Sequence, residues 1–219
     1  MKRIFALLLA LTLALSLAAC GEKTAAPFPA PDEPDAEEPV SLTFDALNVE
    51  FVVGERGVSE LMALQRELPP LLIAALAGEG CAVEKINITF GASADATARS
   101  LNSGAVDAAF LPSEACVLSD FRLRLAALEN ASVGAGEYFP DVDFSALSDV
   151  DADSPIYENA VAFSGDAPGA LCDAFSAALV SLCADVEGSA VMRCYGCASY
   201  LIYGDLGALL APLTACLTR

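Results

Sequence analysis

Cysteine is the residue type with the widest chemical scope in this sequence, since a thiol can pair, ligate a metal, exchange electrons or carry a lipid. The chain has 8 cysteines and no histidine. Cys194 and Cys197 form a C-x-x-C, the spacing of zinc ligands and redox dithiols, but no second pair matches it and no thioredoxin-like context surrounds it. We interpret the cysteines beyond Cys20 as small apolar residues of helices, with disulfide pairing, metal binding and redox exchange as alternatives. They are Cys81, Cys116, Cys172, Cys183, Cys194, Cys197 and Cys216.

The absence of histidine removes the commonest general base and the commonest metal ligand. A serine or cysteine nucleophile would need an unusual base, and no Gly-rich phosphate loop is present, so we expect no enzymatic activity and no cofactor. Asp149, Asp151 and Asp153 alternate like the start of a calcium loop. Ser154 and Ala160, however, stand where the turn glycine and the closing glutamate belong. We therefore expect a solvated acidic loop there and no metal site.

The N-terminal segment has the pattern of a secretory signal. Lys2 and Arg3 precede an apolar run over residues 4–17, and small residues follow directly before Cys20. The run is shorter than the roughly 20 apolar residues that a membrane span needs. The sequence Leu-Ala-Ala-Cys at residues 17–20 resembles the bacterial lipobox, in which the cysteine sulfur takes a diacylglycerol and a peptidase cuts before it.

We therefore expect residues 1–19 to be a lipoprotein signal peptide. Lipid on Cys20 would hold the mature chain on the extracytoplasmic face of a bacterial cell membrane. An ordinary cleaved signal with a chance cysteine and an uncleaved anchor are the alternatives.

The chain is strongly acidic, with 11 basic residues against 30 acidic ones and a formal net charge of −19. This excess argues against nucleic acid, whose phosphates are met by Lys and Arg, and against binding of anionic lipid through a basic face. Prolines and acids crowd between Pro27 and Pro39, a composition that cannot bury apolar surface. We expect residues 20–41 to be an extended tether and residues 42–219 to fold.

Apolar periodicity predicts an α/β domain with a mainly parallel sheet, because strand patterns alternate with helical ones. The expected strands are residues 48–54, 83–90, 105–111, 123–128 and 156–163. The expected helices are residues 59–68, a second one opened by Pro70, and residues 94–102, 113–118, 168–184, 187–195 and 205–217. Residues 129–155 break the alternation and predict an acidic loop.

The order of motifs in two stretches is similar to that of a known family. Residues 90–97, Phe-Gly-Ala-Ser-Ala-Asp-Ala-Thr, lead through residues 101–112, Leu-Asn-Ser-Gly-Ala-Val-Asp-Ala-Ala-Phe-Leu-Pro. Ser-Pro-Ile-Tyr-Glu-Asn at residues 154–159 precedes a further strand, and Asp-Val-Glu-Gly at residues 185–188 introduces the last helices. This order resembles the phosphate/phosphite/phosphonate (PhnD-like) ABC-transporter substrate-binding proteins.

The resemblance implies a type II periplasmic-binding-protein fold, which has two α/β lobes and a ligand between them. Only residues 129–155 stand where the second lobe would be inserted. The chain therefore resembles one three-layer lobe of the family, truncated by reduction of the other lobe to a loop.

The resemblance also implies where a ligand would bind, at the carboxyl ends of the strands of this lobe. The candidate residues are Glu55, Arg56, Ser93, Ala94 and Ser113. The serines would offer hydroxyls and helix N–H groups to a small oxyanion such as phosphonate or phosphate, and Arg56 would add a charge-assisted hydrogen bond. The alternative is that the serines only cap helices and Arg56 is solvated.

Two hypotheses for function follow. In the first, the chain is an extracytoplasmic solute-binding lipoprotein that serves an ABC permease, with weak binding because half of the cleft is open to water. In the second, it is a surface lipoprotein that transports nothing and acts through protein contacts or as a homodimer.

Overall fold

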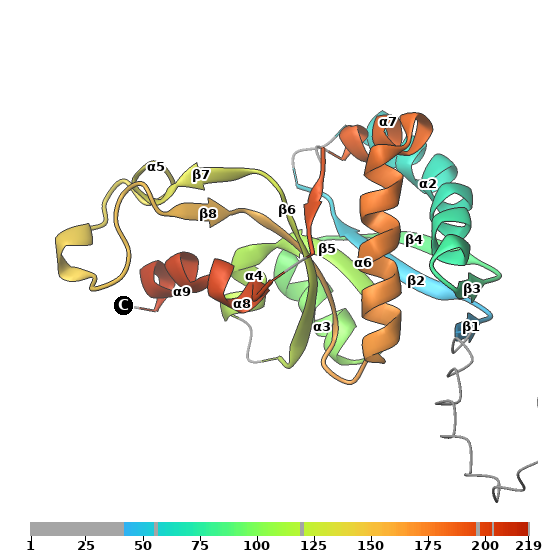
Figure 1. The fold of residues 1–219 in the computed structure, drawn as a ribbon, viewed down its shortest axis with the longest axis horizontal. Helices are drawn as coiled ribbons and strands as arrows, with labels where there is room; N and C mark the ends of the chain where they lie inside the picture. Colours follow the sequence, from blue (N-terminus) through green and yellow to red (C-terminus); the bar gives the residue numbers. More distant parts are fainter. Residues whose placement is uncertain (1–41, 55–56, 119–120, 196–197, 203, 219) are drawn as a thin grey trace, which may run out of the picture. The chain divides into compact units, whose positions relative to one another are not determined.

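A six-stranded sheet in the order β10-β6-β9-β5-β2-β4 is the centre of the fold (Figure 1). The computed structural model describes residues 42–54, 57–118, 121–195, 198–202 and 204–218, so the predictions for Cys20 and the tether lie outside the described residues. The strands of this sheet are β2 (Leu47–Val52), β4 (Ile86–Gly91), β5 (Ala108–Pro112), β6 (Leu123–Glu129), β9 (Asn159–Ser164) and β10 (Tyr200–Leu201). Two short strands, β1 (Leu42–Phe44) and β3 (Cys81–Val83), pair in parallel beside it.

The sheet contains both parallel and antiparallel pairs, which corrects the prediction of a mainly parallel sheet. Strand β2 pairs in parallel with β4 and β5, whereas β9 is antiparallel to both β5 and β6, and β10 is antiparallel to β6. Four strands therefore run the same way, and β9 and β10 run against them. An apolar strand pattern reads the same in both directions, so the sequence could not show that β9 enters between β5 and β6 from the opposite end.

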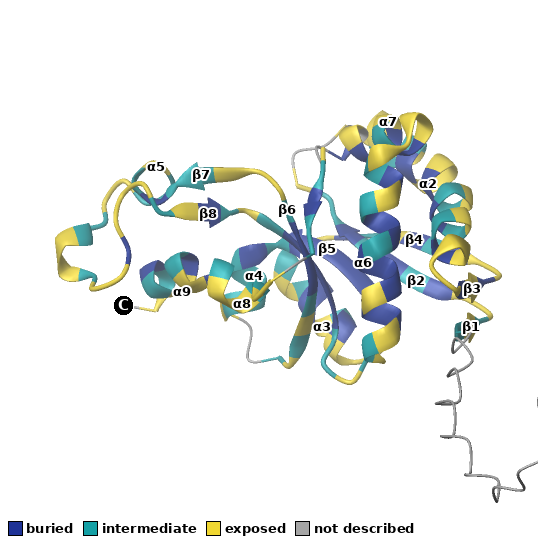
Figure 2. Cartoon of the chain, in the orientation of Figure 1, coloured by how far each residue is buried: buried dark blue, intermediate teal, exposed yellow. Residues whose placement is uncertain are grey.

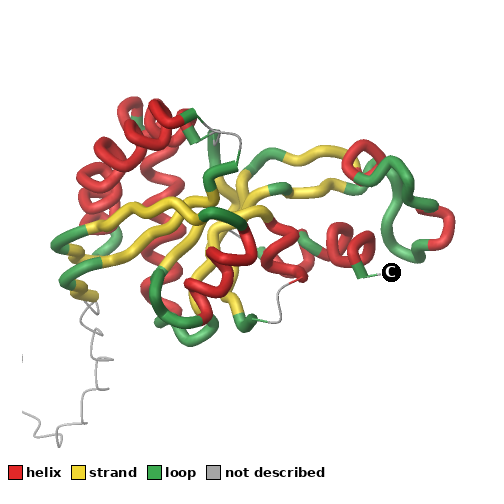
Figure 3. Tube along the Cα trace, turned by 180° about the vertical axis from the view of Figure 1, so that it is seen from behind, coloured by secondary structure: helices red, strands yellow, loops and turns green. Residues whose placement is uncertain are grey.

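Helices cover both faces of the sheet. On one face lie α2 (Val58–Gly78), α6 (Gly169–Ala184) and α7 (Val186–Cys194), and Figures 1 and 3 show them together on that side. On the other face, Ala98 and Leu101 of α3 (Ala94–Asn102) pack with Ala109 and Leu111 of β5. Successive residues of a strand point to opposite faces, so β5 is apolar throughout because both of its faces are covered. The three-layer α/β lobe is thus confirmed.

The aromatic centre of the core joins neighbouring strands. Phe51 of β2 is in register with Phe110 of β5, and their rings stack with centroids 4.1 Å apart. The ring of Tyr195 meets both of them edge-on, at 4.7 Å from Phe51 and 5.7 Å from Phe110. Phe175 of α6 adds a further contact with Phe110 at 6.4 Å. These rings tie the sheet to the helices of one face.

Helix α2 is one helix of 21 residues, although the sequence predicts a break at its two prolines. Pro69 and Pro70 lie inside it and have no N–H to donate to the preceding turn, a loss that normally ends or kinks a helix. Burial on the sheet compensates for this loss. Leu64, Leu68, Leu72 and Leu76, spaced four apart, are all buried and form an apolar stripe that continues through the prolines.

Residues 130–158, which we call the arm, contain more structure than the predicted loop. Strands β7 (Ser132–Gly134) and β8 (Pro155–Tyr157) pair antiparallel, and α5 (Ala135–Tyr138) and a short 3-10 helix, η1 (Phe144–Ala146), lie between them. The arm extends from the sheet beside α9 (Ala211–Leu217), which follows the short helix α8 (Leu206–Leu209) (Figure 1).

A separate apolar cluster holds the arm in place. Ile156 of β8 and Ala135 of α5 are buried in it together with Leu213 and Cys216 of α9. Much of the rest of the arm is exposed (Figure 2). Apolar residues in this segment are spaced without a regular period, so the sequence does not reveal that they share a core with the C-terminal helix.

Among the described residues, no single helix has both the length and the hydropathy to cross a membrane. Only α6 taken together with residues 186–193 passes that test, and the two helices are bent by 99° at their junction.

Candidate functional site

The carboxyl ends of the parallel strands lie next to a small cavity, at the edge where the sequence predicts ligand contacts. Strand β4 ends at Gly91 and leads into α3, and β5 ends at Pro112 and leads into α4 (Ser113–Leu118). A cavity of about 270 Å³ lies between the two helices. Its lining residues are Ala94, Asp95, Ala98, Pro112, Glu114, Ala115 and Leu118.

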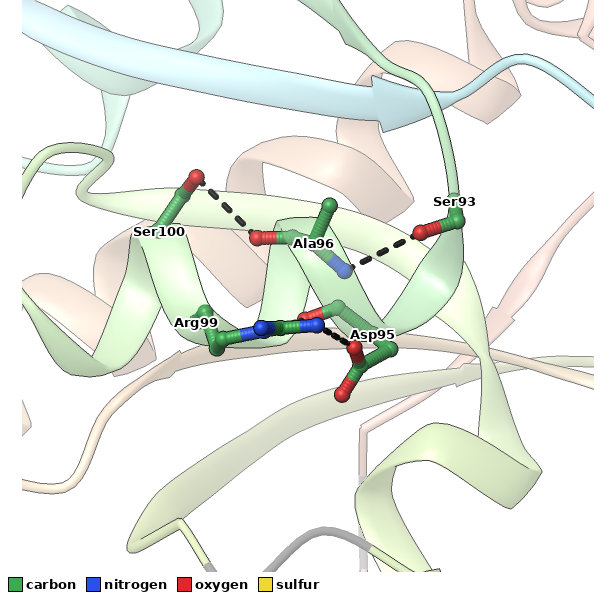
Figure 4. Close-up of polar contacts among 5 residues, drawn as sticks. All are labelled: Ser93, Asp95, Ala96, Arg99 and Ser100. Carbon is green, nitrogen blue, oxygen red and sulfur yellow. Dashed lines mark hydrogen bonds and ion pairs between the residues drawn. The ribbon is translucent and has the colours of Figure 1, made fainter.

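Ser93 and Ala94 lie at the start of α3, as predicted. The Ser93 hydroxyl caps the helix by accepting a hydrogen bond from the N–H of Ala96 at 3.2 Å (Figure 4). This contact is the role that the sequence analysis gave as the alternative to ligand binding, and it uses one acceptor site of the hydroxyl. Ala94 contributes apolar surface to the cavity.

Ser113 is the first residue of α4 and is fully buried. Its N–H donates to the carbonyl of Glu158 at 2.8 Å, while its hydroxyl has no hydrogen-bond partner among the described residues. A buried polar group without a partner costs about 1–3 kcal/mol. Pro112 and Glu114, on either side of Ser113, both line the cavity. Glu55 and Arg56, the other two predicted contacts, lie outside the described residues.

The charges in the cavity do not match the predicted oxyanion. Its lining includes the acidic residues Asp95 and Glu114, and none of its lining residues is Lys or Arg. The nearest described guanidinium on α3 is that of Arg99, which forms an ion pair with Asp95 on the exposed face of the helix (Figure 4). A phosphonate placed in the cavity would meet Glu114, which has no basic partner among the described residues, and Asp95, which Arg99 offsets only in part.

Glu50 of β2 also lies near this edge, and the sequence shows it only as a polar position in a strand. Its carboxylate accepts a hydrogen bond from the hydroxyl of Thr97 at 2.6 Å and a longer one from Thr89 at 3.4 Å. Thr97 is fully buried in the first turns of α3. A carboxylate of the chain itself therefore lies beside the helix start that would otherwise attract an anion. The alternation of apolar and polar residues along β2 predicts that Glu50 is a polar position of the strand, but it cannot indicate that Thr97 is its partner.

Tyr138 of the arm connects α5 to the cavity. Its hydroxyl donates to the carboxylate of Glu114 at 3.2 Å. Burial, the charge and hydrogen bond of Glu114, and the charge of Glu158 together raise the pKa of Tyr138 to about 12. The phenol therefore stays protonated at neutral pH and remains a donor, which orients Glu114. The sequence offered no signal for this contact, since the two residues lie on separate elements.

We expect Tyr138 to ionise at a pH well above that of an ordinary tyrosine, whose pKa is about 10. Between about pH 10 and 12 the folded chain holds a proton that the unfolded chain has lost, so this contribution to stability is present below pH 10 and is lost as the pH rises. Glu114→Gln should lower the pKa of Tyr138 only in part, because burial remains. The phenolate absorbance difference between the wild type and Tyr138→Phe measures the titration, and half-ionisation near pH 10 would contradict the contact.

A larger cavity, about 610 Å³, lies elsewhere, between β6, α6 and residues 202 and 204–207. Arg124, Asp173 and Asp205 give it mixed charge. The Ser176 hydroxyl in its wall is already bonded to the carbonyls of Ala126 at 2.8 Å and Cys172 at 2.7 Å. This cavity is away from the strand ends, and we do not assign it to the candidate site.

The described cysteines behave as apolar residues. Cys81, Cys172 and Cys216 are buried free thiols, and burial raises the pKa of Cys116, another free thiol, to about 12. Burial also raises the pKa of Cys172, although the nearby Arg124 opposes this shift. Cys116 and Cys172 are therefore poor nucleophiles at neutral pH. Cys197 lies outside the described residues, so the C-x-x-C stays a prediction.

Comparison with solved structures supports the sequence resemblance at the level of the fold. XAC2383 from Xanthomonas citri matches in a chloride-bound structure (TM-score 0.54, 9% identity, 77% of this chain and 97% of that chain). It also matches in an ATP-bound structure (TM-score 0.53, 10% identity, 78% and 97%). PhnD1 from Prochlorococcus marinus (MIT 9301), in complex with methylphosphonate, matches with TM-score 0.50 at 6% identity, over 78% of this chain and 99% of that chain.

At such low identity these matches show a shared fold alone. The sequence itself matches no protein-family model and no curated protein.

Proposed function

We propose that the chain is a lipid-anchored, extracytoplasmic solute-binding protein that uses one α/β lobe and an arm in place of a second lobe. The observation that carries the proposal is the cavity between α3 and α4, at the carboxyl ends of β4 and β5. Ligands of open α/β sheets bind at this edge. The methylphosphonate-bound and ATP-bound neighbours with this fold support a small-molecule ligand. An ABC permease would be the partner that receives the solute.

The solute-binding role is tested by calorimetry on the full chain in detergent, with detergent alone as the blank. Methylphosphonate, phosphate and phosphite represent the oxyanions that the sequence resemblance implies, and uncharged and cationic solutes complete the panel. One side of the site is open to water, so we expect dissociation constants of about millimolar. If no solute of the panel gives heat at several times that concentration, the receptor proposal fails. We expect no turnover of any solute, because the chain has no histidine.

The anchor is tested with Cys20→Ala. We expect the wild type to enter the membrane fraction and to incorporate labelled fatty acid, because the thioether at Cys20 is the only attachment point that the lipobox pattern offers. The variant should lose the label and retain its signal sequence. Labelling that survives the substitution would contradict the lipobox assignment.

A second function is favoured by exposed apolar side chains on α2 and α7, two helices that pack on each other. Val58 and Met62 of α2 are 77% and 58% exposed, and Val186 of α7 is 84% exposed. Exposed apolar surface of this kind marks contact sites for other proteins. Sedimentation of the full chain would show a dimer if this surface pairs two copies, and a monomer would count against the homodimer.

A further inference from the structure

We infer that the solute of the cavity between α3 and α4 carries an ammonium group and a short branched apolar body, and is not an oxyanion. This inference rests on the proposed solute-binding function and names the chemical class of the solute. It follows from the lining residues, from the groups already bound to them, and from the charges beside the start of α3.

The apolar part of the lining can accommodate a small aliphatic group. Ala98 is buried beneath the cavity, and Ala94, Pro112 and Ala115 contribute further apolar surface. Leu118, at the end of α4, is 57% exposed, which is unusual for a leucine that borders a cavity. An aliphatic group of about four or five carbons would remove this leucine surface from water, and such removal favours binding in proportion to the apolar area buried.

The charged part of the lining is negative. Asp95 of α3 and Glu114 of α4 are among the residues that line the cavity, and no lining residue is basic. Arg99 partly neutralises Asp95 by ion pairing on the exposed face of α3. Glu114 forms no ion pair with a basic residue among the described residues. Tyr138 donates a hydrogen bond to its Oε1, and no described residue donates one to its Oε2. A charged ammonium, which donates up to three hydrogen bonds, matches an oriented carboxylate with a free oxygen.

The start of α3 is unsuited to an anion. A helix N-terminus normally attracts negative charge, because its first N–H groups have no partners within the helix. Here the Ser93 hydroxyl already accepts from the N–H of Ala96, and Asp95 lies in the first turn. The carboxylate of Glu50 is held beside the same turn by Thr97. An incoming oxyanion would meet charge of its own sign on two sides.

A second observation concerns Ser113. Its fully buried hydroxyl, between the lining residues Pro112 and Glu114, has no partner among the described residues. Ser113 itself is not among the residues that line the cavity. No other side-chain oxygen or nitrogen in the described part of the chain is both buried and unpaired.

The test uses three probes with one carbon skeleton: 3-methylbutan-1-amine, 3-methylbutan-1-ol and 3-methylbutanoate. Binding is followed by ligand-observed NMR with the full chain in detergent, against a detergent blank. We expect the amine to bind about fivefold more tightly than the alcohol, as for a partly exposed ion pair, and the carboxylate to bind more weakly than the alcohol. Glu114→Gln keeps an acceptor for Tyr138 and removes the charge, so it should erase the preference for the amine.

Glu84→Gln is the matched control, because Glu84 is exposed and precedes the amino end of β4, opposite the cavity. It should keep the preference for the amine. If Glu114→Gln does not fold, Asp95→Asn is the second variant and should reduce the same preference, since it frees the Arg99 guanidinium. Equal binding of amine and alcohol by the wild type would overturn the inference.

The remaining outcomes separate this inference from the proposed function. Tighter binding of 3-methylbutanoate or methylphosphonate than of the amine would overturn the charge assignment and leave solute binding standing. If none of the three probes binds, the inference fails; if no solute of the calorimetry panel binds either, the proposed solute-binding role fails as well.

Discussion

Phe110→Ala is expected to lower the free energy of unfolding by about 3–5 kcal/mol, the range for a large aromatic residue lost from a close-packed core. The Phe110 ring is 2% exposed and contacts the rings of Phe51, Tyr195, Phe175 and Tyr200. Alanine would leave a void between β2, β5 and α6 that rigid neighbouring rings cannot fill. The rings also lose the stacking that adds to their burial.

Urea unfolding followed by circular dichroism measures this loss as a fall in the midpoint at an unchanged slope. Met62→Ala is the control, because Met62 is 58% exposed on α2 and its truncation should change stability by no more than about 0.5 kcal/mol. A loss below about 1 kcal/mol for Phe110→Ala would mean that Phe110 does not occupy the centre of the core.

Gly91→Ala is expected to destabilise the chain by about 1–3 kcal/mol, because it inserts a methyl group where the strand end and α3 already touch. A Cβ at Gly91 would fall on the hydroxyl oxygen of Thr97 and 2.6 Å from the Glu50 carboxylate. Thr97 is fully buried and short, so it cannot move aside without displacing α3. The substitution should therefore also disturb the cavity that α3 lines and weaken binding of any solute there.

Gly78→Ala is the matched control for this prediction. Gly78 is the last residue of α2, and no atom lies within 4 Å of a Cβ placed there. Alanine is the better helix former, so this substitution should be neutral or stabilise the chain by up to about 1 kcal/mol. Comparable losses from the two variants would show that the glycine type itself matters, rather than the contact of Gly91 with Thr97 and Glu50.

The structure changes the expected ligand more than it changes the expected place of binding. The strand ends, Ser93 and Ala94 lie where the sequence placed them, next to a cavity. The oxyanion was implied by family resemblance, whereas the acidic side chains at this edge already have partners in the chain: Thr97 donates to Glu50, Tyr138 donates to Glu114, and Arg99 pairs with Asp95. The charge of this edge depends on residues of three elements, Glu50 of β2, Asp95 of α3 and Glu114 of α4, and the stretches that carried the resemblance contain only Asp95 of these.

Local signals in the sequence were sufficient for several elements. Helix α3 runs over the predicted residues 94–102, begins after the capping Ser93, and is followed by Gly104 at a φ of 72°. Helix α6 and strand β6 also lie close to their predicted positions. Caps, turn glycines and apolar periods act over a few neighbouring residues, so they can be recognised without knowledge of the rest of the chain.

The cysteines show both what the sequence can predict and what it cannot. Their interpretation as small apolar residues of helices agrees with the burial of Cys172 in α6 and Cys216 in α9, whereas Cys81 is buried but lies on strand β3. The wider chemistry open to them in the sequence is limited where burial raises the pKa of the thiol, as at Cys116 and Cys172, and that burial is provided by other elements of the fold. The alanine-rich helical patterns around the cysteines predicted that they are buried, but not which neighbouring elements would cover them.

By itself, the sequence determined the α/β class, the helix that starts after Ser93, and the strand ends that lie next to the cavity; solute binding there stays a prediction. Tertiary structure decided that α2 continues through Pro69 and Pro70, that β9 enters antiparallel between β5 and β6, and that the arm shares a core with α9. The physical reason is the distance along the chain over which each interaction acts. Caps and periodicity are local, whereas burial against a sheet, strand direction and the meeting of Tyr138 with Glu114 depend on residues far apart along the chain.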